Sequence, residues 1–325
     1  MNFLIKECST ENDYESFAKL SFDTLVSIRG LPPETSREEF YEWAKGWLKD
    51  FIDQLELNKI FIAIDDHGDY AGHIWLSLEE DLLPWEFEKY FWIQNITVEK
   101  RFRNQGLGKK LMNYAEKLIT SQKGKNIGLH VNIESQAAIS LYRKLKYTEY
   151  KTQFIKNIKL AFQHSFSERQ PSRNVYVKRI EKIDELDSLR TIIFNSFKIK
   201  LRSEAQNNII LIKFDKYFNN LKQNKNDYQF FKILNKNKNI CGYFITSIGE
   251  WRYDDCVIIK DIGVIETSHE KDLLYKIYNF IEEWTQNQNI NLIQIVLMNK
   301  EINLINFFKE NDFEIVGYFM QKKFF

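Results

Sequence analysis

The sequence predicts an α/β protein in which a mixed sheet is flanked by helices, and in which one such unit occurs twice. Short apolar runs with the two-residue period of strands alternate with longer stretches that have the 3.6-residue period of helices. The order of these elements in the first half then repeats in the remainder of the chain. At 325 residues the chain is long enough for two cores. We therefore expect a first domain over residues 1–160 and a second over 172–325.

The first half opens with a strand, two helices and a hairpin. Thr10 or Asn12 is available to cap the first helix, and Ser36 and Glu39 have the spacing of a capping box at the start of the second. The turn-forming stretch DHGD separates two apolar runs, which indicates a β-hairpin. The expected elements are strand 2–8, helices 10–28 and 36–55, and strands 59–65 and 70–78.

The rest of the first half alternates strand and helix. A long apolar run is followed by a glycine-containing turn, and from Leu107 the apolar residues take helical spacing. A short helix that Ser135 can cap separates the last two strands. The polar stretch QHSFSERQPSRN then ends the unit. The expected elements are strand 88–98, helix 107–119, strand 126–133, helix 135–147 and strand 147–156.

The second half repeats this order in an almost constant register. Val264 matches Val98 at an offset of 166, and that offset holds through the following helix and strand, so that Phe308 falls on Tyr142. An offset shared by several elements indicates a tandem duplication. The expected elements are strands 174–180, 228–234, 240–248 and 254–264, with helices 181–197 and 203–221.

Composition and charge exclude several classes of protein. The formal net charge of +1 supplies no global field for nucleic acid or an anionic membrane. No apolar run reaches the roughly 18 residues of a spanning helix, and the first residues lack the pattern of a secretory signal. The three cysteines share no motif spacing, which argues against a disulfide frame or a zinc site. We expect a cytoplasmic monomer or homodimer with no metal, no nucleic-acid partner and no membrane partner.

The stretch RFRNQGLGKK, residues 101–110, contains two of only 12 glycines where a strand gives way to a helix. Glycine lets a ligand approach the backbone closely, and the free N–H groups of a first helical turn favour an anion. Five nearby basic residues make phosphate or pyrophosphate the expected ligand. The alternative is a turn that needs glycine for its geometry, beside a solvated basic face. A Walker loop lacks its GK[ST] here, and a dinucleotide fingerprint lacks its third glycine.

The pattern [Q/R]xxGx[G/A], formed here by Arg103, Gly106 and Gly108, resembles the acetyl-CoA loop of the GNAT superfamily of N-acetyltransferases. The stretch LHVNIESQAAISLYRKLKY is similar to that family's fifth strand and following helix, with Tyr142 in the place of the family's tyrosine. In one departure, Ser135 stands where asparagine is usual. In another, Lys-Tyr replaces the usual Gly-Phe. Combined with the duplication, the resemblance implies two tandem GNAT-like acyltransferase domains.

The resemblance implies an N-acetyltransferase that uses acetyl-CoA as co-substrate and no metal. A primary amine of a small molecule or peptide would attack the thioester directly, and Tyr142 would protonate the leaving thiolate. The pyrophosphate would bind main-chain N–H groups of the loop, and the pantetheine would lie along the preceding strand as an added strand would. The expected acetyl-CoA contacts are Ile96, Val98, Arg103, Asn104, Gln105, Gly106, Leu107, Gly108, Lys109 and Ser135.

The base that removes the amine's proton is less well defined. The family often places a carboxylate on the fourth strand, but Gln94 and Asn95 stand there. Glu88 is the carboxylate nearest the strand and is our predicted base. His130 is better placed than His73 as a shuttle, since it lies on the fifth strand. Two other functions stay open: a non-catalytic acetyl-CoA-binding or sensor protein, and an acyltransferase that uses another acyl-CoA.

The second half keeps the apolar pattern and loses these residues. At the offset of 166, the segment from Arg103 to Gly108 becomes His-Glu-Lys-Asp-Leu-Leu, without glycine and with Asp272. Phe308 replaces Tyr142 and has no proton to give. We therefore expect a degenerate second domain that does not bind acetyl-CoA at its own loop. Its expected role is structural, or to shape the site for the amine acceptor.

Overall fold

The computed structural model forms two compact units, and each is described here by itself. Unit 1 contains strands and helices of the first half, together with the last residues of the chain. Unit 2 contains the second half and the strand that precedes it. The described residues are 2–54, 58–79, 90–149 and 319–324 in unit 1, and 150–158, 175–200, 207–265 and 270–318 in unit 2.

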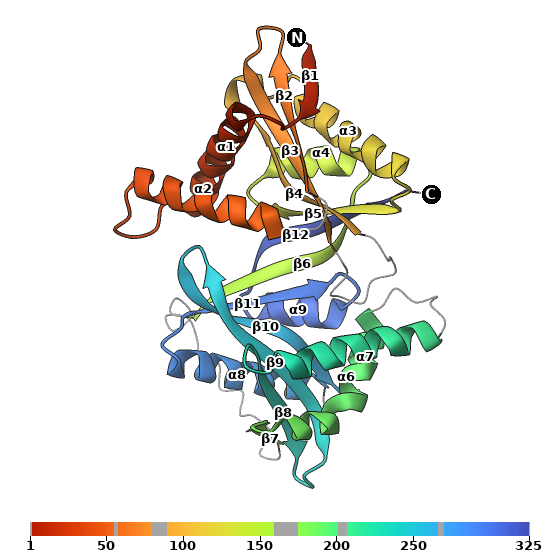
Figure 1. Ribbon diagram of the computed structural model, residues 1–325. Coiled ribbons are helices and arrows are strands. Elements are labelled where there is room, and N and C mark those ends of the chain that lie inside the picture. Colours follow the sequence, from red (N-terminus) through yellow and green to blue (C-terminus); the bar gives the residue numbers. More distant parts are fainter. Residues whose placement is uncertain are drawn as a thin grey trace. The chain divides into compact units, whose positions relative to one another are not determined.

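Unit 1 is a mixed sheet flanked by helices, as predicted (Figure 1). Its strand order is β1-β2-β3-β4-β5-β12, with β4 and β5 parallel. The strands are β1 (Phe3–Glu7), β2 (Lys59–Asp65), β3 (Tyr70–Glu79), β4 (Tyr90–Val98), β5 (Asn126–Asn132) and the end of β12 (Glu314–Lys323). The helices are α1 (Glu11–Arg29), α2 (Arg37–Gln54), α3 (Leu107–Ser121) and α4 (Gln136–Lys144), and a 3-10 turn (Lys100–Phe102) precedes α3.

The two faces of this sheet hold different helices. Trp75 on β3 packs edge-on against Phe17 of α1, with ring centroids 6.0 Å apart. Phe61 on β2 points to the opposite face, where its ring contacts Tyr114 of α3 at 4.9 Å. Side chains alternate along a strand, so residues of one parity face α1 and their neighbours face α3. The α1 face and the α3 face are named accordingly below.

Both predicted helix starts are confirmed. The Thr10 hydroxyl accepts from the Asp13 N–H at 3.1 Å, while the Asp13 carboxylate accepts from the Thr10 N–H at 3.3 Å. Ser36 and Glu39 make the same reciprocal pair at the start of α2, at 3.2 and 3.1 Å. Each pair satisfies two N–H groups that a helix start leaves open, and each fixes where the helix begins.

The last strands of the two halves lie in each other's units. The predicted ranges 1–160 and 172–325 place residues 150–157 in the first domain and 319–323 in the second. The compact units hold them the other way round. In unit 1 the Phe324 N–H donates to the Lys125 carbonyl at 2.7 Å, which fixes the end of β12 beside β5. In unit 2, Lys151–Asn157 pairs antiparallel with β11.

Unit 2 has the matching strand order β6-β11-β10-β9-β8-β7. The predicted helix 181–197 is divided into a 3-10 helix (Ile183–Leu189) and α6. The strands are β6 (Thr148–Asn157), β7 (Val175–Arg179), β8 (Gln229–Asn235), β9 (Ile240–Trp251), β10 (Asp254–Val264) and β11 (Leu292–Met298). The helices are α6 (Arg190–Lys200), α7 (Asn207–Gln223), α8 (Glu270–Asn287) and α9 (Ile302–Glu310).

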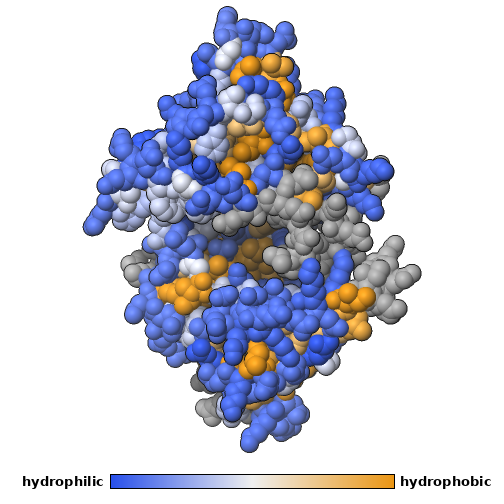
Figure 2. Space-filling model, in the orientation of Figure 1, coloured by the Kyte–Doolittle hydropathy of each residue, from blue (hydrophilic) through white to orange (hydrophobic). Residues whose placement is uncertain are grey.

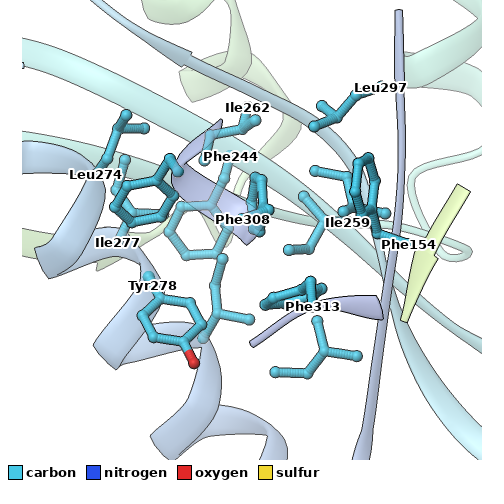
Figure 3. Close-up of a cluster of buried hydrophobic side chains, with 14 of the residues drawn as sticks. Phe154, Phe244, Ile259, Ile262, Leu274, Ile277, Tyr278, Leu297, Phe308 and Phe313 are labelled. Carbon is cyan, nitrogen blue, oxygen red and sulfur yellow. The ribbon is translucent and has the colours of Figure 1, made fainter. Parts of the chain in front are cut away.

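Apolar side chains gather inside each unit. Figure 3 shows the main core of unit 2, which includes Phe154 of β6, Phe308 of α9 and Phe313. On the face in Figure 2 the surface is mostly hydrophilic, and hydrophobic residues form small separate patches. Within the described part of the chain, no helix has both the length and the apolar character needed to cross a membrane.

Candidate functional site

Strand β4 carries one extra residue opposite β3. Trp75 pairs with Asn95, whereas the next residue, Leu76, pairs with Ile93, so Gln94 forms a β-bulge. The Gln94 amide then donates to a serine hydroxyl of β3 at 3.0 Å, which holds its side chain on the α1 face. A bulge bends and twists its strand, so we expect β4 to bend at this residue.

On its other side β4 separates from β5 at the same point. The parallel ladder runs from Phe91–Ile127 to Ile93–Leu129, and β4 then continues to Val98. Over residues 94–98 the described part of the chain therefore gives β4 no ladder partner on the β5 side. Main-chain N–H and C=O groups along such an edge can bond an extended ligand, as in strand addition. Both predicted pantetheine contacts on β4 lie in this stretch.

Gly106 begins α3 in a conformation that favours glycine. Its φ of +80° is left-handed, and a Cβ built there would meet no atom within 4 Å, so conformation and not space requires glycine. The first helical bond runs from the Lys110 N–H to the Gly106 carbonyl at 3.1 Å. The N–H groups of Leu107, Gly108 and Lys109 precede that bond and have no acceptor within the helix. No acidic residue stands in this first turn.

Gly108 is required for a different reason. A Cβ at Gly108 would lie 3.3 Å from a methyl group of Leu141 on α4 and 3.9 Å from a methyl group of Val98. The start of α3 can therefore pack directly against the end of β4 and against α4. This close contact brings together the glycine loop, the unpaired stretch of β4 and the helix that carries Tyr142.

The predicted loop contacts stand exposed around this helix start. Arg103, Asn104, Gln105 and Lys109 are all exposed, and Asn104 also has a left-handed φ of +62°. The Arg103 Nε donates to the Val98 carbonyl at 3.0 Å, which ties the loop to the end of β4. The Gln105 amide donates within the loop, to the Arg101 carbonyl at 3.1 Å. A loop of this kind can surround an anion with main-chain N–H groups and basic side chains.

Tyr142 is 5% exposed, and burial raises the pKa of its phenol above the ordinary value of about 10. The phenol is therefore neutral at every physiological pH and keeps a proton that it can donate. Its ring centroid lies 6.0 Å from that of Tyr147. Ser135 occupies the N-cap position of the same helix, half-buried, and makes no side-chain capping bond there.

The two histidines have different environments. His73 is fully buried, with Ser21 Oγ at 3.3 Å from Nε2 and the Tyr70 hydroxyl at 2.6 Å from Nδ1. Burial lowers the pKa of His73 to about 3, despite a side-chain hydrogen bond with Asn95. His73 is thus a neutral packing residue with no route to solvent. His130, by contrast, is exposed, and its role as the better-placed shuttle stays a prediction.

His130 lies where β4 and β5 separate. It follows Leu129, the last residue of the ladder, and paired residues of a ladder point to one face. Because Trp92 pairs with Gly128, His130 two residues further on shares the face of Trp92. That face is the α1 face, since Trp92 also pairs with Ser77 and Trp75 lies two residues before Ser77. The predicted base Glu88 lies outside the described residues.

Comparison with known proteins identifies the fold around this site. Residues 27–147 match the model of the acetyltransferase (GNAT) family. Unit 1 is a GNAT domain. Part of the chain is also 32% identical over 127 residues to the N-alpha-acetyltransferase daf-31 of Caenorhabditis elegans. That match covers 37% of this chain and 63% of the relative's length, so the chain spans less than two thirds of that relative.

Solved structures match over the whole chain and show that the fold is a tandem GNAT fold. A GCN5-related N-acetyltransferase from Sphaerobacter thermophilus aligns with a TM-score of 0.58 and 12% identity, covering 99% of this chain and 95% of that one. A tandem GNAT protein from the clavulanic acid biosynthesis pathway aligns with a TM-score of 0.55 and 11% identity, covering 99% and 98%. The predicted fold class and duplication are confirmed. At these identities the likeness concerns the fold alone.

Proposed function

We propose that unit 1 is an acetyl-CoA-dependent N-acetyltransferase that acetylates a primary amine. The observation that supports this most directly is the contact at Gly108. It brings a helix start with free N–H groups next to a stretch of β4 without a ladder partner in β5. The first feature suits a pyrophosphate and the second suits an extended amide chain. Acetyl-CoA contains both groups in one molecule.

In this proposal the main-chain N–H groups from Asn104 to Lys109 hold the pyrophosphate, and the basic side chains around them, Arg103 included, add positive charge. The Arg103 N–H itself donates to the Lys100 carbonyl at 3.3 Å. Ile96 and Val98 bond the pantetheine amides along the free edge of β4. Ser135 lines the other side of the opening, at the start of α4. The thioester then lies near the bulge at Gln94, where a main-chain N–H can stabilise the oxyanion that forms during attack.

The amine nitrogen forms a bond to the thioester carbonyl carbon, and the carbon–sulfur bond breaks. Tyr142 donates its proton to the departing sulfur. Burial raises the pKa of the phenol, but a thiolate that forms in the same buried place is destabilised by the same loss of water, so phenolate and thiolate stay comparable in basicity. Tyr142 belongs to α4, which packs against the start of α3. The amine therefore approaches from the α1 face, and a base on that face must take its proton. His130 lies there and reaches solvent, while Glu88 stays a prediction.

We propose a peptide α-amine as the first acceptor class to test, beside small primary amines. The support is the activity in the name of the 32% identical relative. An α-amine has a pKa near 8, so a larger share of it is unprotonated at pH 7 than of a lysine side chain. A weak base such as an imidazole suits that acceptor.

The test is thiol release from acetyl-CoA in the presence of peptides, aminoglycosides and simple amines. We expect at least one primary amine to raise release well above hydrolysis, with the acetylated product found by mass spectrometry. If none does while coenzyme A still binds, the chain is an acetyl-CoA-binding or sensor protein. If propionyl-CoA or a longer acyl-CoA is preferred, the chain is an acyltransferase of another acyl group.

Three substitutions then assign the roles. Tyr142→Phe should lower kcat about 100-fold or more and leave the affinity for coenzyme A unchanged, because the ring stays and only the proton is lost. An unchanged kcat would remove Tyr142 from the mechanism. His130→Gln and Glu88→Gln are compared by their pH profiles. The variant that loses the acid limb of kcat/KM identifies the base.

A further inference from the structure

The end of β12 brings a residue of the second half to the place where β4 and β5 separate. The Phe324 N–H donates to the Lys125 carbonyl at 2.7 Å, and β12 lies next to β5. The ring of Phe319 then contacts His130, with centroids 4.7 Å apart and planes at 57°. It also contacts Trp92, with centroids 6.2 Å apart and planes at 39°. One aromatic cluster thus joins β4, β5 and β12.

This cluster lies on the α1 face of unit 1. Trp92 and His130 point to that face, so Phe319, which touches both rings, lies there as well. Lys322, three residues along the strand, has the opposite parity, and its ammonium lies 2.7 Å from the Glu116 carboxylate on α3. The two sides of β12 therefore serve different faces of unit 1.

We propose that Phe319 is an acceptor-specificity residue of unit 1, with Trp92 as the second side of an apolar wall and His130 at its edge. This inference rests on the proposed function, in which the amine enters from the α1 face. The wall fits an amine whose neighbouring carbon bears an apolar or aromatic group. The ring of Phe319 also restricts the rotation of His130, so the imidazole stays beside the incoming nitrogen.

The consequence is a single acceptor site built from both halves of the chain. Phe319 stands 189 residues after His130 in the sequence and reaches it only through the exchange of last strands. The second half, which lacks the loop and the tyrosine, thereby contributes to the selectivity of the first. The second half thus has a role in acceptor selectivity in addition to packing.

The test compares two acceptors that differ only in the apolar group, phenylalanine amide and alanine amide, on the full-length chain. We expect Phe319→Ala to lower kcat/KM for phenylalanine amide about tenfold more than for alanine amide, because the larger group loses its wall. The affinity for coenzyme A should stay within about twofold. The matched control is Phe324→Ala, whose ring lies near α3 with the cavity-lining residues Asn113 and Lys322. The control should leave the ratio of the two acceptors unchanged.

The outcomes separate this inference from the proposed function. If the unaltered chain acetylates neither amide nor any other amine, the proposed function fails. If it acetylates them and Phe319→Ala leaves their ratio unchanged, the proposed function stands and Phe319 is only a packing residue. Should Phe319→Ala not fold, Phe319→Gln keeps much of the volume but replaces the apolar ring by a polar amide. A ratio unchanged in Phe319→Gln would overturn the inference equally.

Discussion

Units 1 and 2 keep the same backbone irregularities at matching positions. In unit 1 the bulge is Gln94 and the parallel ladder ends at Ile93–Leu129. In unit 2 the bulge is Lys260, and the ladder between β10 and β11 ends at Ile259–Ile295. Each of these residues is displaced from its counterpart by the offset of 166 found in the sequence. The duplication has therefore preserved the opening between two strands, independently of what occupies it.

The side chains at that opening differ completely. In unit 1 the side-chain amide of Asn95 accepts a hydrogen bond from the Thr97 hydroxyl at 2.8 Å, and both of these groups are neutral. The matching residue of unit 2 is Asp261, which is buried and bonded by the ammonium of Lys200 and the hydroxyls of Tyr217 and Tyr243. A neutral polar pair has become a buried ionic cluster.

Lys200 spans the opening of unit 2. Its Nζ also lies 3.7 Å from Glu301, which matches Ser135 of unit 1 at the same offset. Asp261 belongs to β10 and Glu301 to the turn after β11, so the ammonium links the two sides. Burial alone would lower the pKa of Lys200, but the two carboxylates outweigh it and raise that pKa. A fixed internal cation thus lies where unit 1 is proposed to admit a pantetheine.

The helix start and the tyrosine position differ as well. Helix α8 has Glu270 and Asp272 in its first turn, where α3 has no acidic residue. Phe308 has its ring 4.8 Å from that of Phe313, inside the core that Figure 3 shows. Unit 2 therefore fills with its own side chains the positions that unit 1 is proposed to use for a ligand. We predict one coenzyme A site per chain.

The strongest test of this comparison is Gly106→Val. A β-branched residue cannot take the left-handed φ of +80° without strain, so the loop must move away from the start of α3. We expect the Kd for coenzyme A to rise about 100-fold, or about 2.7 kcal/mol, measured by calorimetry. The matched control is Asp272→Gly in unit 2, which should change neither Kd nor a stoichiometry of one. A stoichiometry of two in the unaltered chain would contradict the comparison.

The fold and the loop were predictable because both depend on local patterns. The offset of 166 is visible in the sequence, and so are the two glycines and Tyr142. The exchange of last strands was not predictable. Strands β6 and β12 each have ten residues and begin 166 residues apart, so each could complete either sheet. Local periodicity specifies a strand and its faces, but not which of two similar sheets it joins.

The ionic cluster around Lys200 in unit 2 could not be predicted from the sequence either. Lys200, Asp261 and Glu301 lie far apart along the chain and share no motif, so only the folded backbone brings them together. Phe319 was missed for the same reason, although His130 beside it was recognised from its position on a strand. Contacts between distant residues depend on topology, and no residue pattern reports them.

The second test, smaller in effect, removes the cation of unit 2. Lys200→Met leaves Asp261 buried without its charged partner. Removing one partner of a fully buried ion pair lowers the free energy of unfolding by several kcal/mol. The effect should be smaller here, because the Lys200 side chain is 23% exposed and two tyrosines still bond Asp261. We expect the free energy of unfolding of unit 2 to fall by about 2 kcal/mol. Hydrogen exchange with mass spectrometry measures this change.

The matched control for Lys200→Met is Arg101→Met in unit 1. Arg101 pairs with Asp69 at 2.9 Å, and both side chains are more than half exposed. Surface pairs contribute little, so the change should stay below about 0.5 kcal/mol. Equal effects of the two substitutions would show that Lys200 is an ordinary surface charge and not a structural substitute for a ligand.

The third test lowers the pH, because the two units have different residues at one buried position of β3 and β9. His73 in unit 1 matches Tyr243 in unit 2, at the offset of 170 that relates Gly72 to Gly242. Burial holds the pKa of His73 at about 3, against about 6.5 in an unfolded chain. The unfolded state therefore binds the extra proton first. Stability from the neutral imidazole is complete above pH 6.5 and is lost as pH falls toward 3.

Because the pKa of His73 differs between the folded and the unfolded chain, lowering the pH from 6.5 to 5.5 should lower the free energy of unfolding of unit 1 by about 1 kcal/mol. His73→Gln keeps a side chain that can bond Ser21 and Tyr70 but does not titrate, so its stability should be flatter over that range. Hydrogen exchange at pH 6.5 and 5.5 separates peptides of unit 1 from those of unit 2, where Tyr243 supplies no such titration. Equal acid sensitivity in His73→Gln and the unaltered chain would mean that His73 is protonated in the folded unit.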